Sequence, residues 1–373
     1  MLAKHFSEIQ DSRVDYLVEH KLIDVITIAV CATICGADGW EEIAEWATEK
    51  KEWLKNRLKI DKIPSAATIR RVFILIDPEE FQVSFQTWIS SVCKLIRGQV
   101  IAIDGKQLRG SANRKQGKEA LCIVSAWATA NKIVLGQCKA EEKSNEIAAI
   151  PELLALLDVS DCLVTIDAAG CQTENARLIR QHGGDYLLAL KGNQGTLFDD
   201  VKFAFAVAQK RQFCGIDSDY AETCEEGHGR KEVRRCWTID DERQLQLLRN
   251  HKKWCDLQTI VMIETERTVL SKETTTIERR YFITSASCDA HKLLMAKRSH
   301  WMIENDLHWC LDVGFQEDAH RCGGHGAANL AVVRHMALSL LKQDSSKGSI
   351  KRKRKRAGWN NNFLEQLLCP KLV

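Results

Sequence analysis

Three carboxylates occupy positions from which they could bind metal ions for phosphodiester chemistry. Asp104 closes the apolar run 100–103, Asp167 closes the apolar run 163–166, and Glu304 lies in a segment rich in aromatic and histidine residues. A buried strand that ends in a carboxylate directs that acid to the sheet edge, and two such strands with one helical Glu can hold a pair of hard divalent ions. Singly, each acid is more readily explained as a turn cap or a solvated side chain. Together they favour a site for two Mg²⁺ or Mn²⁺ ions that Asp104 bridges.

Glycine-containing turns are expected directly after three of the predicted strands. They are 104–106, 167–172 and 191–194. Glycine at such a turn lets a phosphate approach the backbone, so Lys106, Lys191 and Asn193 are candidate DNA contacts. Ordinary tight turns would explain the same pattern.

His308 follows Glu304 at i+4, a spacing that places both side chains on one helix face. It could contact DNA or a substrate phosphate, and a histidine of the packed core is the alternative. Zinc binding is a rival interpretation, because further residues of metal-ligand type lie nearby: Cys310, His320, Cys322 and His325. Their spacing matches no standard structural zinc pattern, so we do not expect a zinc site.

The composition is that of a compact globular enzyme. The chain has 373 residues, of which 45% are hydrophobic. Its 15 cysteines are scattered, odd in number and lack a C-x-x-C pair, which favours a reduced compartment over a disulfide framework. We see no secretory signal, and the longest apolar stretch, 22–37, contains Asp24 and is too short to span a membrane. We therefore expect a cytoplasmic, nucleoid-associated protein that does not enter the membrane.

Positive charge is concentrated near the C-terminus. The net charge is +3, whereas Lys347 and the run 351–356 together supply seven positive charges, so the rest of the chain is acidic overall. The run could neutralise DNA phosphates, and a solvated basic tail at 346–373 is the alternative. Its six candidate contacts are Lys351, Arg352, Lys353, Arg354, Lys355 and Arg356.

Residues 1–95 are expected to form a helical N-terminal domain that binds DNA. Apolar residues recur there at helical spacing. Ser65 is the expected N-cap of a helix over 66–76. This helix carries Arg70 and Arg71, which could read DNA, and two solvated arginines on a capped helix are the alternative.

Residues 96–345 change to a pattern of strands and helices in the order βββαβαβ. The predicted class is α/β, a ribonuclease H-like catalytic core that follows the N-terminal helical domain. We interpret 210–285 as a β-rich insertion, after which a helix from residue 290 carries Glu304. Strands are expected at 100–104, 121–128, 133–138, 163–167 and 186–190, helices at 144–158 and 173–182, and insertion strands at 233–239, 259–263 and 279–284.

The motifs, in this order, resemble those of the DDE transposases of bacterial insertion sequences, and in particular the H-repeat-associated branch. The most specific piece is 304–313, which reads ENDLHWCLDV, followed by Glu317-Asp318. The resemblance implies a ribonuclease H-like domain in which Asp104, Asp167 and Glu304 are the metal-binding triad. It covers nearly the whole chain, through 63–65, 68–69, 103–106, 142–146, 150–154, 184–186, 191–194, 228–230, 300–318 and 355–359.

The chain departs from the family pattern at a few positions. Ala169 stands where relatives usually have Met before Gly-Cys-Gln, and Cys322 stands where a basic residue is usual. Broader insertion-sequence relatives carry Tyr, Arg and Lys around the last Glu, whereas here Lys297, His300 and Leu311 lie at those offsets. That flanking signature is therefore not carried over to this chain.

The function that the residues and the resemblance imply is DNA transposition. The enzyme would bind the terminal inverted repeats of its element and then cleave and join strands, with double-stranded repeat and target DNA as partners. Arg230 is a further candidate phosphate contact. Synapsis of two ends would require a homo-oligomer. Two alternatives stay open: a structure-specific DNA nuclease that cuts without joining, and a catalytically silent DNA-binding remnant.

Overall fold

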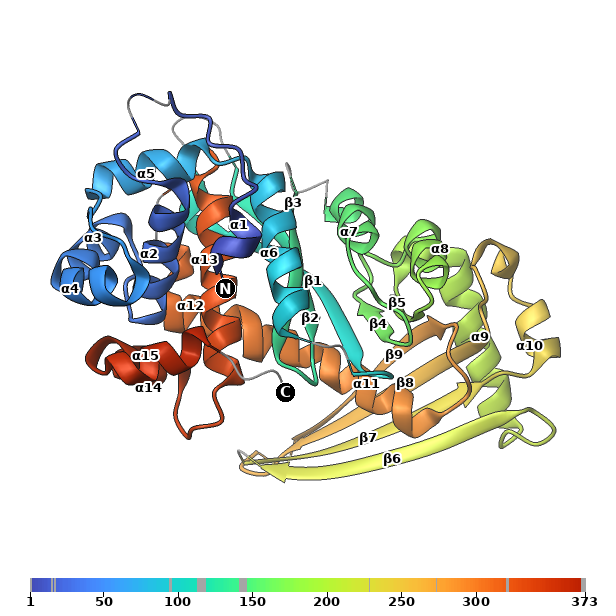
Figure 1. Ribbon diagram of the computed structural model, residues 1–373. Helices are drawn as coiled ribbons and strands as arrows, with labels where there is room; N and C mark the ends of the chain where they lie inside the picture. Colours follow the sequence, from blue (N-terminus) through green and yellow to red (C-terminus); the bar gives the residue numbers. More distant parts are fainter. Residues whose placement is uncertain are drawn as a thin grey trace. The chain divides into compact units, whose positions relative to one another are not determined.

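The chain folds into two compact units, as seen in a computed structural model that Figure 1 colours from the N-terminus to the C-terminus. Unit 1 comprises Met1–Leu95, Gly105–Ala149 and Ile303–Val373, and unit 2 comprises Ile96–Asp104 and Ile150–Met302. Unit 1 contains both N-terminal and C-terminal helices, which pack against one another. The three segments expected from sequence, 1–95, 96–345 and 346–373, stay a prediction. The structure describes residues 2–14, 16, 18–93, 96–112, 119–140, 146–227, 229–272, 274–319 and 322–369.

The front of unit 1 is helical, as the sequence predicted. Ser65 caps α5 by accepting a hydrogen bond from the Thr68 N–H, which confirms the expected helix start. Asp77 caps α6 in the same way, with Pro78 at the first helical position. The elements are α1 (Leu2–Phe6), α2 (Leu22–Ile34), α3 (Trp40–Glu49), α4 (Lys51–Trp53), the π-helix η2 (Leu54–Leu58), α5 (Ala66–Leu75) and α6 (Pro78–Val92).

A buried helix, α13 (Gly326–Gln343), organises the core of unit 1. It contacts α2, α5 and α6, and also the antiparallel hairpin of β2 (Leu121–Ala128) and β3 (Ile133–Ala140). Nearly every residue of α13 is buried, which is typical of a helix surrounded by protein on all sides. The Asn329 amide donates to the carbonyls of Phe73 and Ile76 and so satisfies the C-terminal end of α5.

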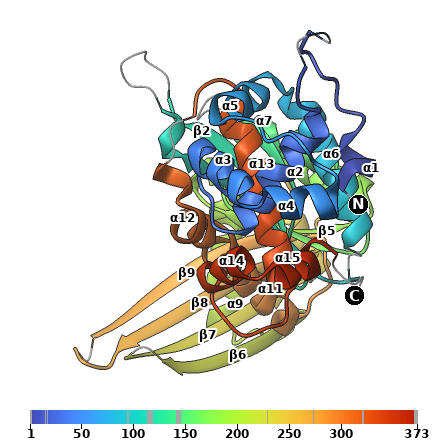
Figure 2. The ribbon, with the colours of Figure 1, turned by 60° about the vertical axis from the view of Figure 1, so that its left-hand side comes forward.

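The predicted basic tail forms two packed helices, α14 (Ile350–Trp359) and α15 (Asn361–Leu368), which lie side by side in Figure 2. Arg354 is buried, pairs with Asp38 at 2.6 Å and donates to the carbonyls of Thr33 and Ala37 at 3.0 Å. Thr33 lies in the last turn of α2 and Ala37 follows that helix, so Arg354 holds α14 against the end of α2. Arg354, within the basic run, is therefore structural.

Unit 2 is built on a mixed sheet. Its strands lie in the order β1-β4-β5-β9-β8-β7-β6, parallel from β1 to β5 and antiparallel from β5 onward. The fold is thus mixed α/β with a large mixed sheet and many helices. The bounds are β1 (Val100–Leu108), β4 (Leu163–Ile166), β5 (Asp185–Leu190), β6 (Ser218–Gly227), β7 (Arg230–Ile239), β8 (Thr259–Val269) and β9 (Thr274–Thr284).

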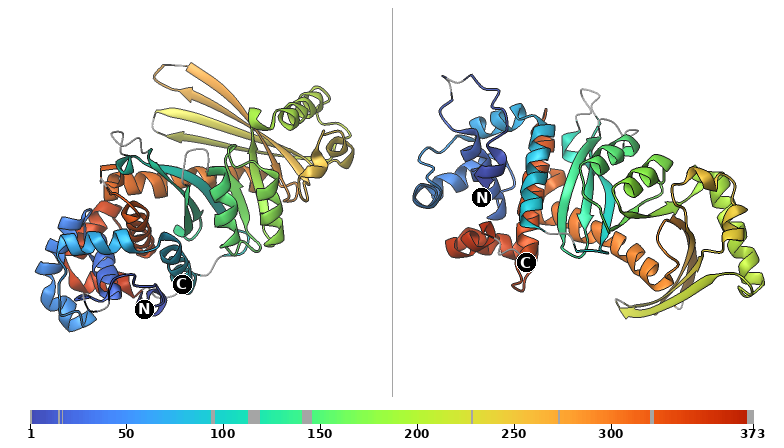
Figure 3. Two further views of the ribbon diagram at one scale, coloured as in Figure 1. Left: turned by 90° about the horizontal axis from the view of Figure 1, so that it is seen from above. Right: turned by 45° about the vertical axis from the view of Figure 1, so that its right-hand side comes forward.

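The β-rich segment continues the sheet of unit 2, because β9 pairs with β5. Its long antiparallel strands β6 to β9 are visible in both views of Figure 3. The three insertion strands expected from sequence are parts of β7, β8 and β9. The helices linked to this sheet are α7 (Glu146–Ala155), α8 (Thr173–Gln181), α9 (Gly195–Lys210), α10 (Glu242–Gln246) and α11 (Ala290–Met302). Ser144, the expected start of α7, lies outside the described residues.

Strand β1 is longer than expected. The sequence predicted an end at Asp104 and a turn over Gly105-Lys106, but the strand continues to Leu108. That prediction was wrong because these residues have partners that keep the chain extended. Lys106 forms ion pairs, and Leu108 packs against Ile123.

Candidate metal and DNA site

Asp104 and Asp167 occupy equivalent positions on neighbouring parallel strands of unit 2. The β1–β4 ladder ends at the pair Ile103 and Ile166, so each aspartate is the first residue beyond it. Neighbouring strands are about 4.8 Å apart, so the two carboxylates lie close together at the C-terminal end of β4. Both side chains are partly buried. The sequence therefore predicted this placement, although Asp104 lies within β1 and not at its end.

The turn after Asp167 is held in a fixed conformation. Asp167 Oδ1 accepts hydrogen bonds from the N–H groups of Ala169 and Gly170, at 3.0 and 3.2 Å. A Cβ at Gly170 would lie 2.3 Å from Cγ2 of Ile166, so only glycine fits there. Among the described residues, no Lys or Arg side chain pairs with Asp167.

Asn193 supports the same turn from the next loop. Its amide donates to the Ala168 carbonyl at 2.6 Å, and the neighbouring Gln194 donates to the Cys171 carbonyl at 2.9 Å. These bonds belong to the 3-10 turn η6 (Gly192–Gln194), which follows β5. The side chain expected to contact DNA is thus engaged in positioning the Asp167 loop.

Glu304 lies on a π-helical segment, η8 (Ile303–His308), between α11 and α12 (Trp309–Phe315). A π-turn inserts an extra residue into a helix and recurs at functional sites. At the spacing i, i+3, i+7 and i+10, a regular helix would place Trp301, Glu304, His308 and Leu311 on roughly one side. Here Trp301 is 57% exposed and Leu311 is 1% exposed, so these two side chains do not share a face. The π-turn changes the direction in which residues after Glu304 point.

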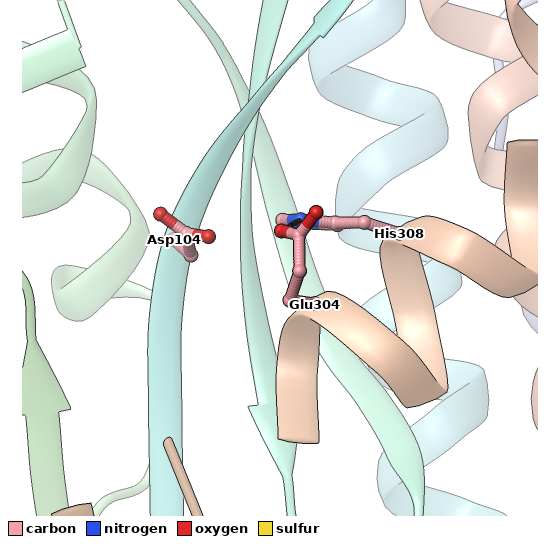
Figure 4. Close-up of side chains that lie close together, drawn as sticks. All are labelled: Asp104, Glu304 and His308. Carbon is pink, nitrogen blue, oxygen red and sulfur yellow. Dashed lines mark hydrogen bonds and ion pairs between the residues drawn. The ribbon is translucent and has the colours of Figure 1, made fainter. Parts of the chain in front are cut away.

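His308 holds the Glu304 carboxylate. Its Nδ1 lies 3.1 Å from Glu304 Oε2, and both side chains come from η8 in the close-up of Figure 4. Burial lowers the pKa of His308, although the neighbouring Glu304 opposes that shift. The imidazole is therefore neutral at neutral pH. Because the His308 side chain is neutral and buried, we do not expect it to bind a DNA phosphate.

Figure 4 draws three side chains of the types that ligate divalent ions. Asp104 comes from β1, and Glu304 and His308 come from η8. Carboxylate oxygens suit Mg²⁺ and Mn²⁺, and an imidazole is also accepted by Mn²⁺. The donor chemistry therefore fits the ions expected from sequence. Asp167 is not drawn in that view and lies at the end of β4.

A second group of charged side chains in unit 1 was not expected from sequence. Lys106 Nζ lies 2.5 Å from Asp312 Oδ1 and 2.6 Å from Glu317 Oε2. Glu317 is buried and also faces Arg334, at 3.8 Å. Burial would raise the pKa of Glu317, but Lys106 and Arg334 outweigh it and the pKa is lowered. Glu317 is thus ionised inside the protein, and Lys106 is unavailable to a phosphate.

The other predicted DNA contacts fall into two groups, one buried and one exposed to solvent. Lys353 and Arg354 are buried, so we withdraw them from the DNA-binding set. Lys353 donates to the carbonyls of Leu341 and Asp344. The exposed candidates are Arg70, Arg71, Lys191, Arg230, Lys351, Arg352, Lys355 and Arg356.

Two further expectations concern metals and membranes. One residue of the rival zinc set, His320, lies outside the described part of the chain. Within the described ranges, no helix combines the length and the apolar composition that a membrane span requires.

Comparison with known proteins places this chain in a family. The transposase DDE domain matches residues 96–341, and the domain associated with it matches residues 3–89. The chain belongs to the DDE transposase family, which confirms the resemblance seen in its motifs.

Two relatives are similar over 99% of this chain. It is 40% identical to "Putative transposase YncI" of Escherichia coli O157:H7, and the match covers 94% of that protein. It is 36% identical to "H repeat-associated putative transposase YhhI" of Escherichia coli strain K12, and that match covers 97% of the relative. The family characteristically uses a divalent metal, and DNA is the partner that membership implies.

Proposed function

We propose that this chain is an active DNA transposase that cleaves and joins strands at the terminal inverted repeats of its element. The observation that carries the proposal is the β1–β4 register, which sets Asp104 and Asp167 side by side where two parallel strands part. Family membership adds the expectation that a third acid completes the site. Glu304, on its π-helical segment with His308 beside it, is that acid.

Asp104, Asp167 and Glu304 would hold two Mg²⁺ or Mn²⁺ ions. Such ions activate the attacking hydroxyl and stabilise the leaving oxygen of an in-line displacement. The protein's own contribution is positioning. The hydrogen-bonded turn after Asp167 leaves Oδ2 available while fixing the carboxylate, and His308 orients Glu304. We also propose that this part of the fold is a ribonuclease H-like core.

Exposed basic residues would bind the DNA backbone. Arg352 and Arg356 lie on the exposed side of α14, and Arg70 and Arg71 lie on α5, all within unit 1. Lys191 and Arg230 are exposed in unit 2. Because phosphate contacts release counterions, the affinity for DNA should fall steeply with salt. Synapsis of two element ends would bring together more than one protomer.

The proposal is tested with purified full-length protein, duplexes that carry the repeats flanking its reading frame, and Mg²⁺ or Mn²⁺. Joined products are expected from the wild type and none from Asp104→Asn. Asp199→Asn, which removes an exposed acid on α9, is the matched control and should join as the wild type does.

Other outcomes discriminate between the functions. Cleavage without joining would favour a nuclease, and repeat binding without any cleavage would favour a silent remnant. Undiminished joining by Asp104→Asn would end the assignment of the triad.

A further inference from the structure

We propose that Lys106 is a positioning residue for the metal site, acting through a clamp made by Lys106, Asp312 and Glu317. The clamp fixes strand β1 to the helical segment that carries Glu304. This inference rests on the proposed function, because it concerns how the candidate metal ligands are held. The ion pairs of Lys106 are with Asp312 and Glu317, neither of which is a proposed ligand of the ions.

The clamp lies close in the chain to two of the acids. Lys106 follows Asp104 at i+2 in the extended strand, so the two side chains lie on the same face of β1. Asp312 is on α12, which continues directly from the π-helical segment that carries Glu304. One ion pair of 2.5 Å therefore joins the two chain segments that supply Asp104 and Glu304.

Burial makes the Lys106–Glu317 part of this clamp stiff, whereas the Asp312 side chain is 38% exposed. The Lys106 side chain is only 12% exposed, and the Glu317 side chain is 1% exposed. Charges at such a position are poorly screened by water, so their geometry is costly to change. Leu108, the next residue on the same face of β1, packs against Ile123 and Ala331 and extends the attachment.

The clamp also lies beside the residue that orients Glu304. Lys106, Glu317 and His308 line one small pocket together with Leu311 and His335. Loss of the Lys106 charge would leave Asp312 without its cation, and Glu317 with Arg334 alone, beside that histidine. Partners of this kind, which touch no metal themselves, typically change metal affinity by about 10- to 100-fold.

The structure offers a matched control on the same helical segment. Lys342 of α13 pairs with Asp306 at 2.6 Å, and its side chain is 11% exposed. The two lysines are thus alike in burial, and their ion pairs with Asp312 and Asp306 are alike in length. They differ in what they attach, since the Lys342 pair joins η8 to α13 and does not involve β1.

The test measures Mn²⁺ binding to the full-length protein by electron paramagnetic resonance, with the unfolding temperature recorded for each variant. Lys106→Met should weaken Mn²⁺ binding by about 10-fold or more. Lys342→Met should bind within about 2-fold of the wild type, and Lys106→Arg should recover part of the loss, since it keeps the charge. Asp312→Asn is the milder variant if Lys106→Met does not fold, and it should also weaken binding.

The outcomes separate this inference from the proposed function. Wild-type Mn²⁺ affinity in a folded Lys106→Met or Asp312→Asn variant would overturn the clamp, and so would an equal loss in Lys342→Met. In contrast, absence of Mn²⁺ binding by the wild type, or full binding by Asp104→Asn, would refute the proposed metal site itself.

Discussion

Two groups of carboxylates in this chain are alike in residue type and differ in their surroundings. Asp312 and Glu317 face the Lys106 ammonium, and Glu317 also faces Arg334, so their charge is neutralised inside unit 1. Asp167 and Glu304 instead meet backbone N–H groups or a neutral histidine, and within the described ranges no Lys or Arg pairs with either. An acid that already has a cation stabilises the fold, whereas one held without a cation keeps negative charge for a metal ion.

The largest effect is expected from removing a proposed metal ligand, which is Asp104 or either acid of the second group. Asp104→Asn, Asp167→Asn and Glu304→Gln should each lower strand transfer on the order of 10³-fold or more, because each would remove a proposed ligand. The unfolding temperature should stay close to that of the wild type. A loss of stability in proportion to the loss of activity would instead show that these acids are structural.

The reverse behaviour is expected for the first group. Glu317→Ala leaves Lys106 and Arg334 buried without their shared partner, so we expect a loss of about 3–5 kcal/mol in the free energy of unfolding. Urea denaturation measures this quantity. An unchanged denaturation midpoint would show that Glu317 is not the structural acid described above.

Basic residues of α14 should likewise divide into a buried one that stabilises the fold and an exposed one that binds DNA. Arg354→Met should cost about 3 kcal/mol of stability, because it leaves Asp38 and several carbonyls unpaired. Arg352→Met, at an exposed position, should leave stability within about 0.5 kcal/mol. It should instead reduce by about 1 the slope of log DNA affinity against log salt concentration. Equal effects of the two variants on DNA binding would contradict the division by exposure.

A smaller effect is expected from pH. Burial lowers the pKa of His335 from 6.5 to about 4, against the opposing charge of Glu317. The unfolded chain binds this proton at a higher pH than the folded chain does, so stability is present above pH 6.5 and falls as the pH decreases to about 4. His335→Gln should flatten that part of the curve of denaturation midpoint against pH. A curve as steep as that of the wild type would contradict this assignment.

The sequence predicted the order of elements well, since periodicity and caps are local signals. The order βββαβαβ and the Ser65 cap are both found in the structure. Long-range pairing was not predictable. Lys106 meets its partners 206 and 211 residues away, so the ordinary reading of Asp-Gly-Lys as a turn was wrong.

Two other features of the site were also beyond sequence reasoning. No local sequence pattern separates the π-turn at Glu304 from a regular helix. Regular helical spacing therefore did not predict where the side chains around Glu304 point. Within the basic run, nothing marks Arg354 as buried beside the exposed Arg352, because the distinction depends on carbonyls near the end of α2. The motif that carries Asp312 and Glu317 was visible in sequence, but their roles required the partner from β1.

The most direct test of the central claim is anomalous diffraction from crystals of the full-length protein soaked in Mn²⁺. The account predicts anomalous peaks at the carboxylates of Asp104, Asp167 and Glu304, and none at Asp312 or Glu317. The absence of any peak at saturating Mn²⁺, or peaks only at Asp312 and Glu317, would contradict it.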